Sequence, residues 1–271
     1  LPGQTFQIQP AEFTKVAVVV ALAAFVANQG GHLRLVTLSN AYLMLAVPLG
    51  LIYLQPDLGT MLVFVAIGMG VLLVAGAQLK HIFVTSLIGV VVVVAMFNSD
   101  NLGGPALLRQ TQEQRLTAFL DPGFDLQGAS YNINQSQIAI GAGGLRGQGW
   151  LQGTQTNLNL VPEQETDFIF TALGEEFGFV GVSLLLLLYA YMLARIWFIA
   201  RASNDLFAAF ACVGALSMLT FQIFQNIGMT MGIMPITGIP LPFLSHGGSS
   251  TVVAFGLIGL VINVSARRHL T

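Results

Sequence analysis

The chain alternates long apolar runs with short polar breaks, and seven of these runs have the character of membrane-spanning helices. A helix needs about 20 mostly apolar residues to cross a bilayer, and shorter segments are tolerated inside a bundle. The predicted spans are residues 11–28, 40–54, 57–76, 81–97, 176–199, 205–228 and 249–266. The pattern therefore predicts an all-α polytopic membrane protein, with seven transmembrane helices in one membrane domain over residues 1–271.

The second and third predicted spans are separated by a short polar break at Gln55, Pro56 and Asp57. Proline lacks the backbone N–H that a continuous helix needs, and a polar break is tolerated only at an interface or in a watery cavity. The break favours two short spans over one long helix.

One connection, from Asn98 to Glu175, is far longer than the others. Compact helical proteins usually join neighbouring helices in 2–8 residues, so a connection of this size is expected to carry function. It contains the glycine-rich segment GAGGLRGQG, Gly141 to Gly149. The segment matches no phosphate-loop pattern, so a backbone cradle for phosphate and plain turn formation both stay open.

Composition supports the membrane assignment, because 55% of the residues are hydrophobic and only 8% are charged. Soluble domains carry about 25% charged residues. The mean hydropathy is +0.77 and the net charge is −2, which disfavours nucleic acid as a partner. The single cysteine, Cys212, lies in an apolar run, so the chain has neither an intrachain disulfide nor a cysteine-based metal site.

The charges are distributed unequally between the two predicted membrane faces. Lysine and arginine concentrate in short cytoplasmic connections, which predicts that the cationic face is cytoplasmic. On that face lie Arg34, Lys80, Arg195, Arg201, Arg267 and Arg268. All of the 12 acids except Asp205 fall on the opposite face, together with the long connection. We therefore expect residues 98–175 to form an extracytoplasmic loop, and an odd number of further spans to precede Leu1.

The densest acidic cluster is PEQETDFIF, Pro162 to Phe170, where Asp167 directly precedes apolar residues. A carboxylate where water is scarce has a raised pKa and can act as a general base near neutral pH. Asp167 is therefore the candidate catalytic base. For Glu163, Glu175 and Glu176, stabilisation of helix N-termini is the preferred interpretation.

A second cluster lies in QPAEFTK, Gln9 to Lys15, where Glu12 and Lys15 share one helix face. Ionisable groups at such depth normally face the bundle interior with a partner, and Asp57 is a candidate partner of Lys15. A structural ion pair and direct contact with substrate both stay open.

The segment from Asn226 to Ser250 contains three prolines and then begins the last span with Gly247, Gly248, Ser249 and Ser250. Exposed N–H groups at such a helix start suit an anion such as pyrophosphate. His246 is interpreted as a structural residue. The arginines of the long connection could clamp phosphate oxygens; they are Arg109, Arg115 and Arg146.

Several strings run in the same order as in one known family. They are QPAEFTK, QPDLGT, RLTAFLDP, QSQIAIGAGGLRGQG, GTQTNLNLVPEQETDFIFTALGEEFGFVG and GIMPITGIPLPFLSHGGSS. Together they resemble the SEDS family of shape, elongation, division and sporulation proteins, and its elongation members more than its division members. His246 departs from the tyrosine usual in the family, and Glu165 stands where elongation members often have histidine.

The resemblance implies ten transmembrane helices, three of them upstream of this chain. It also implies that Asp167 is the essential aspartate of the large external loop. The residues expected to bind substrate are Lys15, Glu12, Asp57, Arg115, Gln135 and Ser249.

The implied reaction is glycosyl transfer from lipid II, with inversion at the anomeric carbon, by a peptidoglycan polymerase of the bacterial plasma membrane. Lys15 and Arg115, or a divalent cation such as Mg²⁺ or Mn²⁺, would stabilise the departing pyrophosphate. The implied partners are a class B penicillin-binding transpeptidase, other proteins of the elongation complex and membrane lipids. A lipid II flippase and a non-catalytic scaffold are the alternative functions. The mechanism requires the Asp167 carboxyl to open onto a groove that is continuous with the lipid phase.

Overall fold

The computed structural model describes residues 9–30, 35–55, 57–97, 110–120, 128–158 and 160–267. Within these ranges the chain forms ten helices and no strands. The helices are α1 (Pro10–Ala27), α2 (Leu35–Leu54), α3 (Leu58–Val74), α4 (Leu79–Phe97), α5 (Gln110–Leu120), α6 (Ala129–Gly143), α7 (Thr154–Asn157), α8 (Ile169–Arg201), α9 (Leu206–Thr230) and α10 (Gly248–Arg267). The predicted all-α fold is confirmed for these residues.

Five of the described helices are long and apolar enough to cross a membrane, namely α1, α2, α8, α9 and α10. Two shorter apolar helices, α3 and the stretch Leu79–Val92 of α4, correspond to the third and fourth predicted spans. The break before Asp57 separates α2 from α3, as predicted. The chain is therefore a multi-pass membrane protein, and the count of seven spans stays a prediction.

The largest difference from the predicted boundaries is at α8, which begins at Ile169 rather than near residue 176. The two parts of this helix meet at Gly178, whose φ of 62° is outside the helical region. The uninterrupted apolar run starts only after that residue, and for this reason the hydropathy pattern misses the first turns of the helix. The kink separates a short part that contains Glu175 and Glu176 from the long apolar part.

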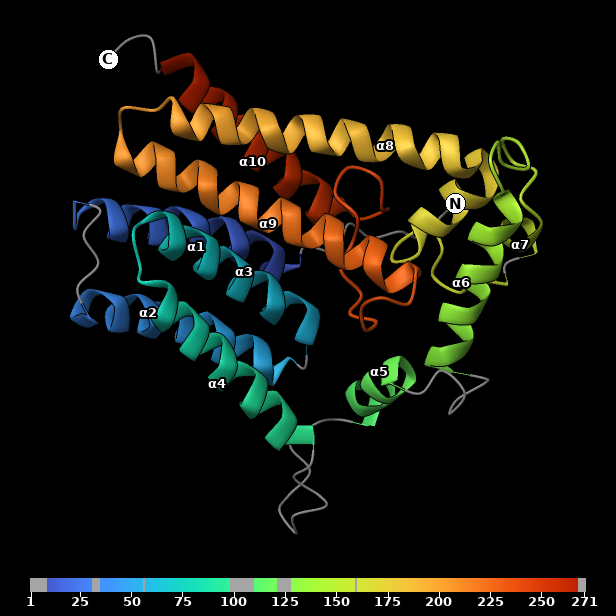
Figure 1. Ribbon diagram of the computed structural model, residues 1–271, viewed down its shortest axis with the longest axis horizontal. Coiled ribbons are helices and arrows are strands. Elements are labelled where there is room, and N and C mark those ends of the chain that lie inside the picture. The colour runs from blue at the N-terminus through green and yellow to red at the C-terminus, as the bar shows by residue number, and fades with distance from the viewer. Residues whose placement is uncertain are drawn as a thin grey trace.

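The core of the bundle lies where α1, α3 and α8 pack around α9 (Figure 1). Leu22 of α1, Phe64 and Ile67 of α3, and Leu219 of α9 are completely buried there. Lipid tails are as apolar as these side chains, so close van der Waals packing rather than removal from water stabilises this core. By contrast, α4 and the apolar part of α8 expose many large hydrophobic side chains, as expected for surfaces that face lipid.

The bundle has two different ends (Figure 1). At one end α8 leaves the bundle and α9 enters it, and α10 also ends there. This end carries Arg195, Arg201 and Arg267. At the other end lie α5, α6, α7 and the segment before α8, so the carboxylates of that segment are far from the cationic end.

Candidate active site

The turn that carries Asp167 is held by hydrogen bonds within residues 163–168. Glu163 has a positive φ of 55°, and its carbonyl oxygen accepts from the N–H groups of Thr166, Asp167 and Phe168. The Phe168 side chain anchors the turn in a small apolar cluster with Ile133, Val161, Met229 and Ile236. The neighbouring Asp167 is thereby placed at the entrance of α8 and stays half-buried.

The Asp167 carboxyl lies against Gly238, in the connection between α9 and α10. A Cβ atom at position 238 would be 3.2 Å from Asp167 Oδ2 and 3.9 Å from an Arg115 guanidinium nitrogen. Gly238 also has a φ of 71°, so both its backbone conformation and the lack of space favour glycine. Aspartate and arginine therefore face each other across a glycine.

No ion pair within 4 Å joins Arg115 to Asp167. Among the described residues, the structure shows such a pair between Lys15 and Glu12. Arg115 lies on α5 and is exposed. Both groups lie within 4 Å of the position that a Cβ atom at Gly238 would take, so one ligand bound there would contact both. Such an arrangement can accept a proton at one group and stabilise an anion at the other.

The pKa of the Asp167 carboxyl is raised above its ordinary value, mainly because burial disfavours the charged form. The positive charge of Arg115 opposes this rise, whereas the carboxylates of Glu163 and Asp57 add to it. The sequence-based expectation of a sparingly hydrated acid at this position agrees with the structure. Asp57 therefore belongs to the electrostatic surroundings of Asp167.

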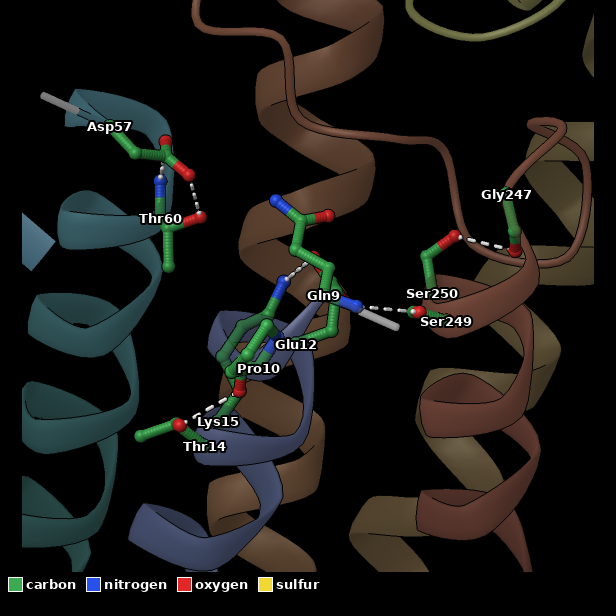
Figure 2. Close-up of polar contacts among 10 residues, drawn as sticks. All are labelled: Gln9, Pro10, Glu12, Thr14, Lys15, Asp57, Thr60, Gly247, Ser249 and Ser250. Carbon is green, nitrogen blue, oxygen red and sulfur yellow. Dashed lines mark hydrogen bonds and ion pairs between the residues drawn. The ribbon is translucent and has the colours of Figure 1, made fainter. Parts of the chain in front are cut away.

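Lys15 forms its ion pair with Glu12 on the same helix, with 2.5 Å between Nζ and Oε1 (Figure 2). The candidate pairing of Lys15 with Asp57 is wrong. The Asp57 carboxylate instead caps α3, where it accepts from the Thr60 N–H and hydroxyl. The cap satisfies a backbone donor that the start of a helix leaves without a partner.

We expect Lys15→Met to lower the free energy of unfolding by about 3–5 kcal/mol, because it leaves the Glu12 charge buried without its partner. Lys15 is 1% exposed and Glu12 4%. The double variant Glu12→Gln with Lys15→Met is expected to recover most of this loss. Thermal unfolding in detergent measures both effects. A Lys15→Met protein as stable as the wild type would contradict a structural pair, and a stable but inactive double variant would indicate substrate contact.

The other predicted binding residues lie in separate parts of the same end. Ser249 is buried in the first turn of α10, where its hydroxyl accepts from the Gln9 N–H (Figure 2). Gln135 is half-buried on α6. The next residue, Ser136, donates to the Thr230 carbonyl and so fastens α6 to α9. Among the predicted residues, Asp167, Arg115 and Asp57 come together, whereas contact of Gln135 and Ser249 with substrate stays a prediction.

The glycine-rich segment packs backbone to backbone against α8. The N–H groups of Gln148 and Gly149 donate to the carbonyls of Glu175 and Glu176. A Cβ atom at Gly178 would lie 2.3 Å from the Gly147 nitrogen. Turn formation and close packing therefore account for Gly147 and Gly149 without a phosphate cradle.

Glu175 has the capping role that the sequence suggested. Its carboxylate accepts from the N–H groups of Gln155 and Thr156 at the start of α7. The side chain is completely buried. This carboxylate is therefore engaged in holding α7 against α8.

An open groove of about 630 Å³ lies beside the turn that carries Asp167. It is lined by Glu165, Ile169, Leu244, Ser245, His246, Gly247, Gly248, Thr251 and Val252. Asp167 is not part of this lining, so the expected opening of its carboxyl onto a lipid-continuous groove is not confirmed. The His246 side chain is exposed, and the residue's backbone N–H donates to the Glu165 carbonyl. Any residue can make this backbone bond, so the structural interpretation of the histidine side chain stays a prediction.

Among the residues that the structure describes, no three His, Cys, Asp or Glu side chains come together as a set that could hold a metal ion. Mg²⁺ needs only one or two carboxylates when substrate phosphates supply further ligands, so the expected divalent cation stays a prediction. No step of the proposed mechanism passes through a metal.

Sequence reasoning missed three polar residues of α9: Gln222, Gln225 and Asn226, all buried. Gln225 and Asn226 donate hydrogen bonds to the connection that follows the helix. Their place in an apolar span was an available signal that this face of α9 packs against a polar segment, because polar groups in a membrane helix normally face the bundle interior and have a partner there.

The fold and the site define a class: a helical membrane protein with a half-buried carboxylate and an arginine at one end of the bundle. The family model described as "Cell cycle protein", for FtsW, RodA and SpoVE, matches residues 2–270. The chain belongs to this family, as the sequence motifs indicated.

Two named relatives match nearly the whole of this chain over about three quarters of their own length. The peptidoglycan glycosyltransferase MrdB of Escherichia coli K12 is 40% identical over 265 residues, which cover 97% of this chain and 70% of MrdB. The peptidoglycan glycosyltransferase RodA of Treponema pallidum is 32% identical over 97% of this chain and 76% of that protein.

Solved structures show the same architecture. A chain of a peptidoglycan synthase complex that coordinates polymerization and crosslinking has a TM-score of 0.80 and 31% identity, covering 100% of this chain and 73% of that chain. The crystal structure of Thermus thermophilus RodA has a TM-score of 0.65 and 29% identity, covering 99% of this chain and 68% of that chain.

Proposed function

We propose that this chain is a peptidoglycan glycosyltransferase that polymerises lipid II, with Asp167 as the general base. The carrying observation is the half-buried Asp167 carboxyl, which faces Arg115 across Gly238 at the end of the bundle that holds α5, α6 and α7. The names of the relatives support the enzyme class, and the raised pKa supports the role of the aspartate.

In the proposed reaction, the Asp167 carboxylate accepts the proton of the acceptor sugar's 4-hydroxyl as that oxygen bonds to the anomeric carbon of the donor. The acceptor oxygen attacks the face opposite the pyrophosphate as the bond from this carbon to the pyrophosphate oxygen breaks, so the configuration is inverted. Pyrophosphate is a good leaving group, so no second carboxyl is required as a general acid. The Arg115 guanidinium stabilises the negative charge that develops on the leaving group.

The proposed setting is the external face of the bacterial plasma membrane, where a lipid-linked disaccharide can reach the site without leaving the membrane. The route by which the lipid reaches Asp167 stays a prediction. A class B penicillin-binding transpeptidase is the proposed partner. This proposal is supported by the solved peptidoglycan synthase complex that coordinates polymerization and crosslinking, because one chain of that complex is similar to this chain.

The function is tested by supplying lipid II to the purified protein that contains this chain and separating the products on a gel. Glycan strands of increasing length support the proposal. Translocation of lipid II across vesicles without any polymer would identify a carrier instead, and a protein with neither activity would be a scaffold.

A further inference from the structure

Three consecutive carbonyl groups around Asp167 are bound by segments that lie much later in the chain. The Glu165 carbonyl accepts from the His246 N–H, and the Thr166 carbonyl accepts from the Ser245 hydroxyl. The Asp167 carbonyl accepts from the Asn226 amide at 2.8 Å. The end of α9, the connection to α10 and the segment before α8 all lie at one end of the bundle (Figure 1).

Asn226 joins the two segments that meet at the site. Its side chain is completely buried, and its Nδ2 donates both to the Asp167 carbonyl and to the Ile239 carbonyl, each at 2.8 Å. Both partners are acceptors, so the amide nitrogen of Asn226, which carries two hydrogens, must face them rather than the side-chain oxygen. Asn226 therefore ties the backbone of Asp167 to the residue that follows Gly238.

Ser245 makes a second tie between the same segments. Its hydroxyl donates to the Thr166 carbonyl and accepts from the Leu241 N–H at 2.7 Å. Ser245 is buried as well, so loss of the hydroxyl would leave a donor and an acceptor without partners away from water. The two side chains hold adjacent residues of the turn against residues 239 and 241.

We propose that Asn226 and Ser245 are positioning residues, which hold the Asp167 carboxyl over Gly238 at its working distance from Arg115. This role rests on the proposed function of Asp167. Neither side chain reaches the reacting atoms, since both act on the main chain of the turn. A displacement of about 1 Å at a reacting group can cost on the order of 100-fold in rate, so two ties on one turn have a direct catalytic consequence.

The neighbouring Gln225 provides a matched control. It is completely buried on the same helix, and its Nε2 donates to the Pro235 carbonyl in the same connection. Replacement of Gln225 by Ala removes a buried amide and its hydrogen bond, as replacement of Asn226 does, but it leaves the ties to residues 166 and 167 in place. A purely structural role of Asn226 predicts equal behaviour of the two variants.

The test measures kcat and KM for lipid II polymerisation, together with thermal unfolding, for Asn226→Ala, Ser245→Ala and Gln225→Ala. We expect Asn226→Ala and Ser245→Ala to lower kcat by roughly 10- to 100-fold, with KM changed by less than about threefold. We expect Gln225→Ala to keep kcat within about threefold of the wild type, even if its unfolding temperature falls as far as that of Asn226→Ala. Ser245→Ala removes a single oxygen atom, so it keeps the test decisive if Asn226→Ala fails to fold.

Two further outcomes are distinguished by including Asp167→Asn in the same series. If Asp167→Asn is inactive while Asn226→Ala and Ser245→Ala match Gln225→Ala in kcat, the positioning role is overturned and the catalytic role of Asp167 stands. If Asp167→Asn polymerises at the wild-type rate, both the proposed function of Asp167 and the positioning role are overturned.

Discussion

Asp167→Asn is expected to lower the rate of glycan polymerisation by roughly 10²–10⁴-fold, the range that a general base contributes. Asparagine has nearly the same shape, and its side chain can still lie against Gly238, but it cannot accept the proton of the acceptor hydroxyl. Initial rates with purified protein and lipid II measure the effect, and thermal unfolding confirms that the variant is folded.

The matched control for this variant is Glu163→Gln, which removes a carboxylate from the same turn. Glu163 is exposed, and one of its carboxylate oxygens accepts from the Thr166 hydroxyl at 3.1 Å. Its loss should leave the polymerisation rate within about threefold, since a surface substitution of this kind changes little. Equal losses of rate in both variants would show that the turn, and not the base, had been tested.

Arg115→Gln is expected to lower kcat by roughly 10²-fold, because the transition state loses a cation that stabilises the departing pyrophosphate. The same change raises the pKa of Asp167 further, since the Arg115 charge is the influence that lowers it. The pH at which activity is half-maximal on the acid side should therefore move upward. A pH series of kcat/KM for the variant and the wild type measures both effects.

Arg146→Gln is the control for the loss of a positive charge. Arg146 is also exposed, and it lies in the glycine-rich segment that packs on α8. We expect its removal to leave the acid-side half-maximal pH unchanged. An Arg115→Gln protein with the wild-type rate and the wild-type pH dependence would exclude Arg115 from the site.

The hydropathy pattern predicted the helical class and most helix positions because membrane spans are long and uniformly apolar. It placed the start of α8 too late, because Glu175 interrupts the apolar residues of the first turns. In the structure the Glu175 carboxylate has backbone partners from α7, and so its burial is compensated. The residues that compensate the burial of Glu175 are about 20 positions away, so a local window of sequence does not reveal them.

The candidate site was predicted in part for a similar reason. Asp167 could be selected because an acid beside a run of apolar residues is locally unusual. Arg115 and Asp167 come close to each other beside Gly238. This proximity depends on how α5 meets the connection after α9, which no local spacing encodes. The pairing of Lys15 with Asp57 failed because Glu12, one turn away on the same helix, is the nearer carboxylate.

The most direct test of a half-buried carboxyl as the base is the pH dependence of kcat/KM for lipid II polymerisation by the wild-type protein. We expect an acid-side limb whose midpoint lies above the value of about 4 usual for aspartate, and which is absent from any residual activity of Asp167→Asn. A limb that persists unchanged in Asp167→Asn would show that another group accepts the proton.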